Sequence, residues 1–259
     1  MGRHRMSMND PHVARLRYRI EHSDSVDFNK AEPLVHETEL FELRVEAGAA
    51  CFDMKEHFAT EAEAREAVAP FITAWELDAD LHDATDRFRL EFDRAEVIDR
   101  QPTPGVIHVD GLTIAIELGG DVKVHVGRHS YPKPGAHLSV NPTVELMWDR
   151  YRRYVEGRTS ITDAAYFCVT ALEAAAGGRS KIPTKFGISV EIIKQMGNLS
   201  SEKGGSEARK ARGAGNPMSD AERRWLTEAI KLVLRRVAQV CANPSAVSPA
   251  LTKADLPKL

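Results

Sequence analysis

Cysteine is scarce in this chain, and long apolar runs are absent from it. The three cysteines among its 259 residues are Cys51, Cys168 and Cys241. This odd number at wide spacings fits neither a disulfide framework nor a zinc site, so we expect reduced, mostly buried thiols in a cytoplasmic protein. The most apolar stretch, residues 164–176, is too short for a membrane span and contains Glu173. Residues 1–10 lack the apolar core of a secretory signal.

Histidine is missing from the second half of the chain. All 10 histidines lie at or before His137. Charge divides at the same place: residues 1–137 contain 16 Lys/Arg and 26 Asp/Glu, whereas residues 138–259 contain 19 and 12. The formal net charge of −3 is therefore the remainder of −10 and +7. This division suggests an acidic or nucleic-acid partner for the basic half, docking of the halves on each other, or simply two solvated domains of different composition.

The sequence predicts an α+β protein, with an N-terminal mixed sheet-and-helix domain followed by a C-terminal all-α helical bundle. The turn-forming residues 131–135, Tyr-Pro-Lys-Pro-Gly, mark the division between the two. The predicted segments are a flexible N-terminus (1–10), an acidic α+β domain (11–130), a linker (131–140), a basic helical bundle (141–243) and a flexible tail (244–259).

Alternating apolar residues predict strands in the first half. The inward-facing sets are Leu16, Tyr18 and Ile20, with arginines at 15, 17 and 19 opposite; Phe41, Leu43 and Val45; and Phe88, Leu90 and Phe92. Residues 112–118 and 122–126 predict a hairpin with a three-residue loop. Thr60 and Glu63 form a capping box that opens a helix, and Pro70 within it leaves open one helix or two short ones.

Apolar residues at helical spacing, between recognisable caps, predict four helices in the second half. The first begins at Pro142 after Asn141 and stops at Gly157, and the second runs from Ser160 to the Gly177-Gly178 pair. A short third helix over residues 189–196 is expected to end at Gly197. The last has a capping box at Ser219 and Glu222 and ends at Asn243-Pro244.

A long glycine-rich segment over residues 198–217 is the candidate anion site, because long loops inside compact domains are usually functional or disordered. The candidate nucleic-acid or anion-binding residues are Lys203, Arg209, Lys210, Arg212, Arg223 and Arg224. The P-loop pattern is absent. The loop lacks interleaved aromatic residues, which argues against stacking of single-stranded bases on it. An ordinary solvated loop next to a charged helix face is the structural alternative.

The histidines of the first half do not form a compact ligand motif. His108, His125 and His129 lie near Asp99, Asp110 and Glu117 in sequence. Such residues could bind a metal or act as acid and base, but alternation on an exposed sheet face yields the same composition. We therefore predict no metal, no cofactor and no assigned catalytic residue.

Short helices with a polar, basic segment before a long final helix resemble, over residues 141–241, the HEPN-type helical domains of prokaryotic defence and toxin systems. Many members of that family are metal-independent ribonucleases, with an Arg, a polar residue and a nearby His as signature. At the matching place this chain has residues 197–204, in which Asn198 corresponds to the polar position. No Arg immediately precedes Asn198 and no His follows His137, so the resemblance implies a helical module without the catalytic pair.

These patterns together predict a cytoplasmic, non-enzymatic binding component, and the HEPN-type resemblance implies a role in a prokaryotic defence system. Its basic helical domain would contact nucleic acid, a phosphate-bearing ligand or an acidic protein partner, and no membrane. One alternative is a ribonuclease or other phosphoryl-processing enzyme whose site combines Arg209, Lys210 or Arg212 with His108, His125 or His129. Another is a homo-oligomeric scaffold held by contacts between acidic and basic domains.

Overall fold

The computed structural model describes residues 10–23, 26–28, 30–82, 87–101, 126–135, 137–205 and 215–259. The chain forms two compact units, one of Met1–Ile72 and Asp86–Pro134, the other of Thr73–Thr85 and Gly135–Leu259. Strands are concentrated in the first half and helices in the second, which confirms the predicted mixture of the two. No helix in the described part of the chain is long and apolar enough to cross a membrane.

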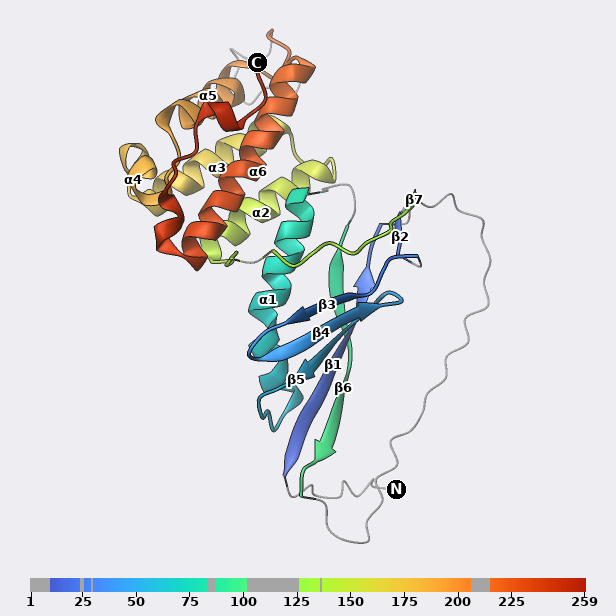
Figure 1. Ribbon diagram of the computed structural model, residues 1–259. Helices are drawn as coiled ribbons and strands as arrows, with labels where there is room; N and C mark the ends of the chain where they lie inside the picture. The colour runs from blue at the N-terminus through green and yellow to red at the C-terminus, as the bar shows by residue number, and fades with distance from the viewer. Residues whose placement is uncertain are drawn as a thin grey trace, which may run out of the picture. The chain divides into compact units, whose positions relative to one another are not determined.

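The first unit contains a five-stranded antiparallel sheet with the order β3-β4-β5-β1-β6 (Figure 1). Its strands are β1 (Pro11–Glu21), β3 (Leu34–Glu37), β4 (Phe41–Glu46), β5 (Ala49–Met54) and β6 (Arg89–Asp99). A separate parallel pair joins β2 (Val26–Asp27) to β7 (Val126–Gly127). The predicted hairpin over residues 112–126 falls almost wholly outside the described residues.

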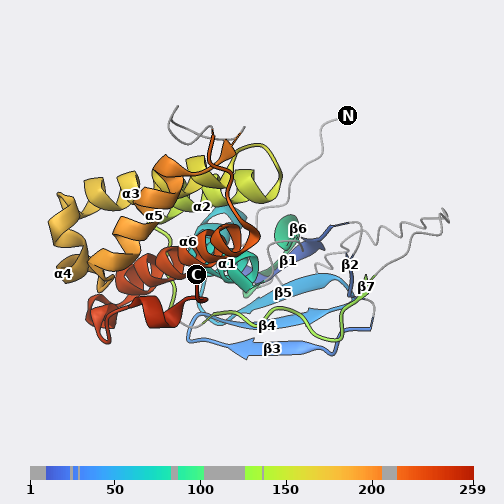
Figure 2. The same cartoon turned by 90° about the horizontal axis from the view of Figure 1, so that it is seen from above.

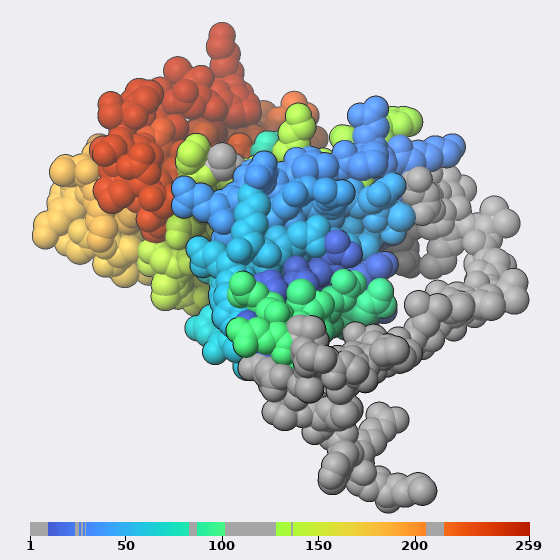
Figure 3. Space-filling model, turned by 60° about the horizontal axis from the view of Figure 1, so that its bottom comes forward, coloured from blue at the N-terminus to red at the C-terminus, as the bar shows by residue number. Residues whose placement is uncertain are grey.

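The faces of β1 are those that the alternation predicts. Leu16, Tyr18 and Ile20 are buried. A bulge at residue 14 puts Val13 on the same inner face as Leu16, three residues away. The arginines at 15, 17 and 19 lie on the outer face, where they form ion pairs with Asp53, Asp93 and Glu91. Side chains of β1 and β6 lie next to each other at the surface (Figure 3).

Helix α1 (Glu61–His82) is a single helix. Its capping box is confirmed, because Thr60 Oγ1 accepts from the Glu63 backbone and the Glu63 carboxylate accepts from the Thr60 backbone. Pro70 lies on the exposed side, where water can hydrate the carbonyl that lacks its usual donor. Within the first unit, the Phe71 ring packs 5.0 Å from that of Phe41.

The second unit is helical, and the second part of α1 belongs to it. Its other helices are α2 (Pro142–Val155), α3 (Ile161–Ala176), α4 (Ile182–Phe186), α5 (Val190–Glu202) and α6 (Asp220–Ala242), with short 3₁₀ turns η1 (Arg179–Lys181), η4 (Pro244–Val247) and η5 (Lys253–Asp255). The N-caps predicted at Asn141, Ser160 and Ser219 are confirmed. The pattern did not predict α4 or η1, which are too short to show a helical period.

Leu77 and Leu81 of α1 share one core with α2, α3, α5 and α6. Trp148 Nε1 donates to the buried Asp80 carboxylate at 2.7 Å, and Arg235 donates to Asp78 at 3.2 Å. This packing shifts the charge division, because the acidic end of α1 belongs to the helical unit. Counted by unit, the charges are −6 and +3 rather than −10 and +7.

The prediction that Gly197 ends the third helix is wrong. Helix α5 continues through Gly197 to Glu202, so the first five residues of the predicted loop 198–217 are helical. Beyond them the structure describes residues 203–205 and 215–217 of this segment. The Gly204 backbone N–H donates to the Asn216 carbonyl at 3.0 Å, so the two described ends of the segment meet.

The segment after α6, for which the sequence predicts a flexible tail, packs on the helical unit. Leu251 and Leu256 are buried. The Leu251 N–H donates to the Gly187 carbonyl at 2.7 Å, and the Ser189 N–H donates to the Leu251 carbonyl at 2.9 Å. The guanidinium of the buried Arg236 donates to the carbonyls of Ala246 and Pro249. The predicted linker also begins inside a packed region, since Tyr131 is buried.

Candidate functional site

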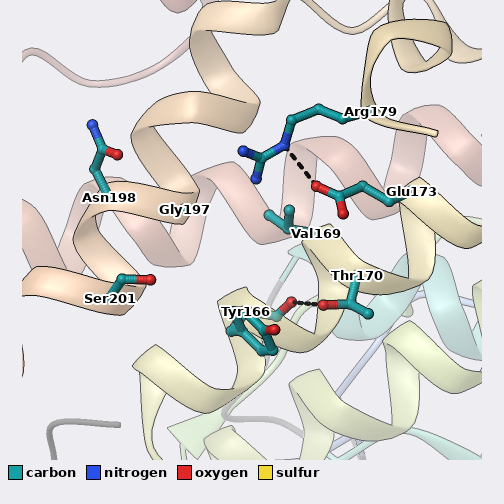
Figure 4. Close-up of a pocket in the computed structure, with 8 residues that line it drawn as sticks. All are labelled: Tyr166, Val169, Thr170, Glu173, Arg179, Gly197, Asn198 and Ser201. Carbon is teal, nitrogen blue, oxygen red and sulfur yellow. Dashed lines mark hydrogen bonds and ion pairs between the residues drawn. The ribbon is translucent and has the colours of Figure 1, made fainter. Parts of the chain in front are cut away.

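A pocket of about 340 Å³ opens between α3, η1 and α5 of the helical unit (Figure 4). These helices lie side by side in both ribbon views (Figure 1, Figure 2). The residues that line the pocket are Tyr166, Val169, Thr170, Glu173, Arg179, Gly197, Asn198 and Ser201. Most of these side chains carry polar groups, which is the lining that a polar ligand requires.

Helix α3 contributes one face of the pocket. Tyr166, Thr170 and Glu173 are spaced by four and three residues, so they lie above one another on the same side of the helix. The Thr170 hydroxyl donates to the Tyr166 carbonyl at 3.0 Å, which holds that hydroxyl against the helix. The Tyr166 side chain remains exposed.

Arg179 reaches the pocket because the chain reverses direction after α3. Gly177 has φ +74°, and the N–H groups of Gly177 and Gly178 donate to the carbonyls of Ala174 and Glu173. This reversal returns Arg179 to the end of α3, where its Nε lies 2.6 Å from Glu173 Oε1. Within the described residues, no other side chain or carbonyl binds the two terminal amino groups of the guanidinium.

Gly197 makes room for Arg179. A Cβ atom at Gly197 would lie 3.2 Å from a terminal nitrogen of the Arg179 guanidinium, closer than ordinary van der Waals contact. Glycine in a helix interior is destabilising by about 1 kcal/mol relative to alanine. The close approach of Arg179 gives a physical reason for a glycine in the interior of α5.

Helix α5 lines the other side of the pocket. Asn198 and Ser201 are three residues apart, and Lys194 lies one turn before Asn198 on the same side of the helix. Asn198 and Lys194 are exposed. Figure 4 shows Ser201 directed toward the side of the pocket that holds Tyr166.

Of the residues that the sequence predicts as an anion site, the three that the structure describes do not line this pocket. Lys203 Nζ lies 3.1 Å from Glu222 of the α6 capping box, so it joins the end of α5 to the start of α6. Arg223 is half-buried and Arg224 is exposed on α6. The three remaining candidates, Arg209, Lys210 and Arg212, lie outside the described residues.

Of the polar residues that line the pocket, the sequence analysis singled out Asn198, through the HEPN-type resemblance, but neither Arg179 nor Tyr166. Arg179 adds to the basic character of the second half, but nothing in a linear pattern places it on Glu173. Tyr166 lies within an apolar helical stretch and belongs to no motif, so the sequence does not distinguish it from a core residue. The one available signal was an acid six residues before an arginine, separated from it by two glycines, which fits a helix end that folds back on itself.

The histidine cluster provides no site in the described part of the chain. His129 is exposed, and its carbonyl accepts from the Glu32 N–H at 3.1 Å. His108 and His125 lie outside the described residues. Among the residues that are described, no group of three or more His, Cys, Asp or Glu is placed to hold a metal ion.

A second pocket, of about 370 Å³, has two neutralised cations. Leu81, Leu232 and Leu256 form its apolar part. Its cations, Lys231 and Arg235, lie 3.2 Å from Glu228 and Asp78 respectively. None of the described residues that line it is aromatic. Arg179 is also paired with a carboxylate, but through Nε, whereas Arg235 uses a terminal amino group to bind Asp78. The α3–α5 pocket is the better candidate for an anion because the terminal amino groups of Arg179 bind no other described group.

No family model matches the chain, and neither a curated protein nor a solved structure matches it. The HEPN-type resemblance therefore stays a prediction. The chemistry of the α3–α5 pocket is the basis for a functional assignment.

Proposed function

We propose that the protein is a non-enzymatic binding component whose helical unit holds a phosphate-bearing ligand in the α3–α5 pocket. The observation that carries this proposal is the position of Arg179 in the pocket wall, held through Nε by Glu173. An arginine fixed in this way presents its terminal N–H groups in one plane, the geometry that matches the oxygens of a phosphate.

The surroundings of Arg179 favour an anion. Asn198 supplies an amide at the pocket wall, and Lys194 adds positive charge one turn away on α5. Glu173 lowers the net charge of the site, but it also fixes the guanidinium and so reduces the entropy lost on binding.

The same lining favours binding over catalysis. Phosphodiester cleavage through a 2′-hydroxyl normally uses a base and an acid with pKa values near neutrality. The described residues that line the pocket include no histidine, and the one carboxylate among them is that of Glu173, which pairs with Arg179. A role in a prokaryotic defence system, with nucleic acid as the partner, belongs to the same proposal and rests on the helical arrangement of residues 141–241.

Fluorescence anisotropy with a labelled single-stranded oligonucleotide of about 15 nucleotides tests the proposal, at salt concentrations of about 50 and 200 mM. Arg179→Ala should weaken binding about tenfold to hundredfold, since a hydrogen bond to a charged group contributes about 1.5–3 kcal/mol. Arg158→Ala is the matched control, because Arg158 Nε also donates to a glutamate, Glu156, at 2.6 Å but Arg158 lies outside the pocket.

The two arginine variants separate a specific site from general attraction. Equal affinity losses in Arg158→Ala and Arg179→Ala would mean that net charge alone attracts the oligonucleotide. Absence of binding by the unaltered protein at about 50 mM salt would contradict the proposal as a whole.

A further inference from the structure

We infer that the ligand of the α3–α5 pocket is one nucleotide of a single-stranded nucleic acid, with its base stacked on Tyr166 and its phosphate on Arg179. This inference rests on the proposed function and adds the class of ligand. It is carried by Tyr166, which the phosphate contact does not require.

Tyr166 is an unusual residue for its position. Among the Phe, Trp and Tyr residues that the structure describes, Tyr166 is the most exposed, with 37% of its surface accessible. The large aromatic side chains of the neighbouring helices, such as Trp148, Tyr151 and Trp225, are buried. An exposed ring in the wall of a polar pocket is the feature that proteins use to stack an unpaired base.

The spacing along α3 suits a nucleotide. Tyr166 and Glu173 are seven residues apart, which is about 10 Å along the helix axis. Because Glu173 holds Arg179, the guanidinium and the ring lie toward opposite ends of the pocket (Figure 4). A nucleoside with its adjacent phosphate has a comparable extent, so one ligand can contact both side chains.

The chemistry favours a single strand over a duplex. Bases in a duplex are stacked on their neighbours and would have to leave the stack to reach a ring on a helix surface. On the α5 side of the pocket, the Asn198 amide has both a donor and an acceptor, which an unpaired base edge can use. Tyr166 of α3 thus supplies the aromatic ring that the sequence of residues 198–217 lacks.

The test compares two oligomers of equal length and charge, one with bases and one abasic, on the full chain. Tyr166→Ala should weaken binding of the base-bearing oligomer by about fivefold to a hundredfold, as expected for the loss of one stacked base. Binding of the abasic oligomer should already be weaker and should not change in this variant. Tyr166→Phe keeps the ring and should retain affinity.

Matched measurements separate stacking from other effects. Leu146→Ala is the control, since Leu146 is another exposed apolar residue of the same unit, outside the pocket. Far-UV circular dichroism checks that each variant is folded. Arg179→Ala should lower the slope of log affinity against log salt by about one, and Tyr166→Ala should leave the slope unchanged.

Each outcome decides a different point. If both oligomers bind equally and both lose affinity in Arg179→Ala, the proposed phosphate site stands and the nucleotide inference is wrong. If neither oligomer binds, the proposed function itself fails. If a free nucleoside monophosphate binds as tightly as the base-bearing oligomer, the ligand is a free nucleotide and the strand is excluded.

Discussion

Gly197 lies inside a helix, although the sequence pattern predicts that the helix ends there. Glycine after a run of helical residues normally marks a helix end, which is why the pattern predicted a stop there. Helix α5 instead passes through it, and the missing side chain leaves space for the Arg179 guanidinium. No local pattern could reveal this, because residues 179 and 197 belong to different elements.

Gly197→Ala should therefore separate stability from binding. Alanine should stabilise the helix by up to about 1 kcal/mol, because its helix propensity is higher than that of glycine. The new Cβ atom should not cancel this gain, since the atom it crowds is the far end of the flexible Arg179 side chain, which can move aside. The displaced guanidinium should bind the oligonucleotide more weakly. Urea denaturation and anisotropy measure the two effects, and a loss of stability would show that Arg179 cannot move.

Cys168 provides a second prediction for a single residue. It is fully buried in α3, and this burial raises the pKa of its thiol to about 12. Cys51 and Cys241 are only partly buried, and burial also raises their pKa values. Alkylation of the native protein at about pH 8 should leave Cys168 unmodified while the other two react slowly. Modification of Cys168 at the rate found in denaturant would contradict its burial.

At the scale of elements, the start of α6 is fixed both by a local cap and by an ion pair to another helix. Ser219 and Glu222 form the predicted capping box, and Lys203 from the end of α5 pairs with the same glutamate. Burial acts to raise the pKa of Glu222, but the hydrogen bonds from Ser219 and Lys203 outweigh it and lower the pKa overall. Lys203 thus stabilises a helix junction.

Glu222→Gln should lower stability in a pH-dependent way. Because the folded pKa of Glu222 lies below the unfolded value, its carboxylate stabilises the fold above the unfolded pKa, and this contribution is lost as pH falls through the folded pKa. We expect a loss of about 0.5–1 kcal/mol at pH 7 that disappears once the pH is below the folded pKa of Glu222. Urea unfolding across this range measures it.

Glu228→Gln is the control for that experiment. Glu228 pairs with Lys231 at 3.2 Å on the outside of α6, where an ion pair contributes little. Gln at position 222 can still accept the hydrogen bond from the Ser219 backbone, so the comparison isolates the charge. Equal losses in the two variants would contradict a special role for the Lys203–Glu222 pair.

The C-terminal segment leads to a prediction at the same scale. Leu251→Ala should destabilise the protein by about 2–3 kcal/mol, because it removes a buried side chain from the core of the helical unit. Leu259→Ala is a matched control eight residues later, since Leu259 is exposed. Chemical denaturation measures the free energy of unfolding of both variants. Equally small losses in the two would contradict the packing of this segment and support the flexible tail that the sequence predicts.

At the scale of the whole molecule, the unit boundary alters the meaning of the net charge. The four acidic residues among residues 73–85 belong to the helical unit, which brings its charge to +3. Many of its described arginines and lysines also pair with carboxylates of the same unit, as Arg153 does with Asp149 and Arg179 with Glu173. Both facts weaken the electrostatic drive toward a scaffold of acidic and basic units.

We therefore expect sedimentation velocity to give the same coefficient at about 50 and 500 mM salt, because a charge-driven assembly is screened at the higher concentration. A coefficient that falls as salt rises, in the absence of nucleic acid, would favour the homo-oligomeric scaffold instead. Added oligonucleotide should raise the coefficient only at the lower salt concentration.

The sequence by itself determined the elements that depend on local physics. The alternation in β1 and β4 and the caps at Thr60, Asn141 and Ser219 are each set by residues a few positions apart, and the structure has them as predicted. The sequence predicted the start of helix α5 correctly but placed its end wrongly at Gly197. The residue that explains this glycine, Arg179, belongs to another element.

Only the tertiary structure decided the candidate site. Tyr166, Arg179 and Asn198 come from three elements and carry no common spacing, so no sequence pattern joins them. The packed C-terminal segment is similar, since its composition is that of a tail and its order comes from hydrogen bonds to Gly187 and Arg236. Burial and pairing between distant residues depend on how helices pack, and local patterns do not contain that information.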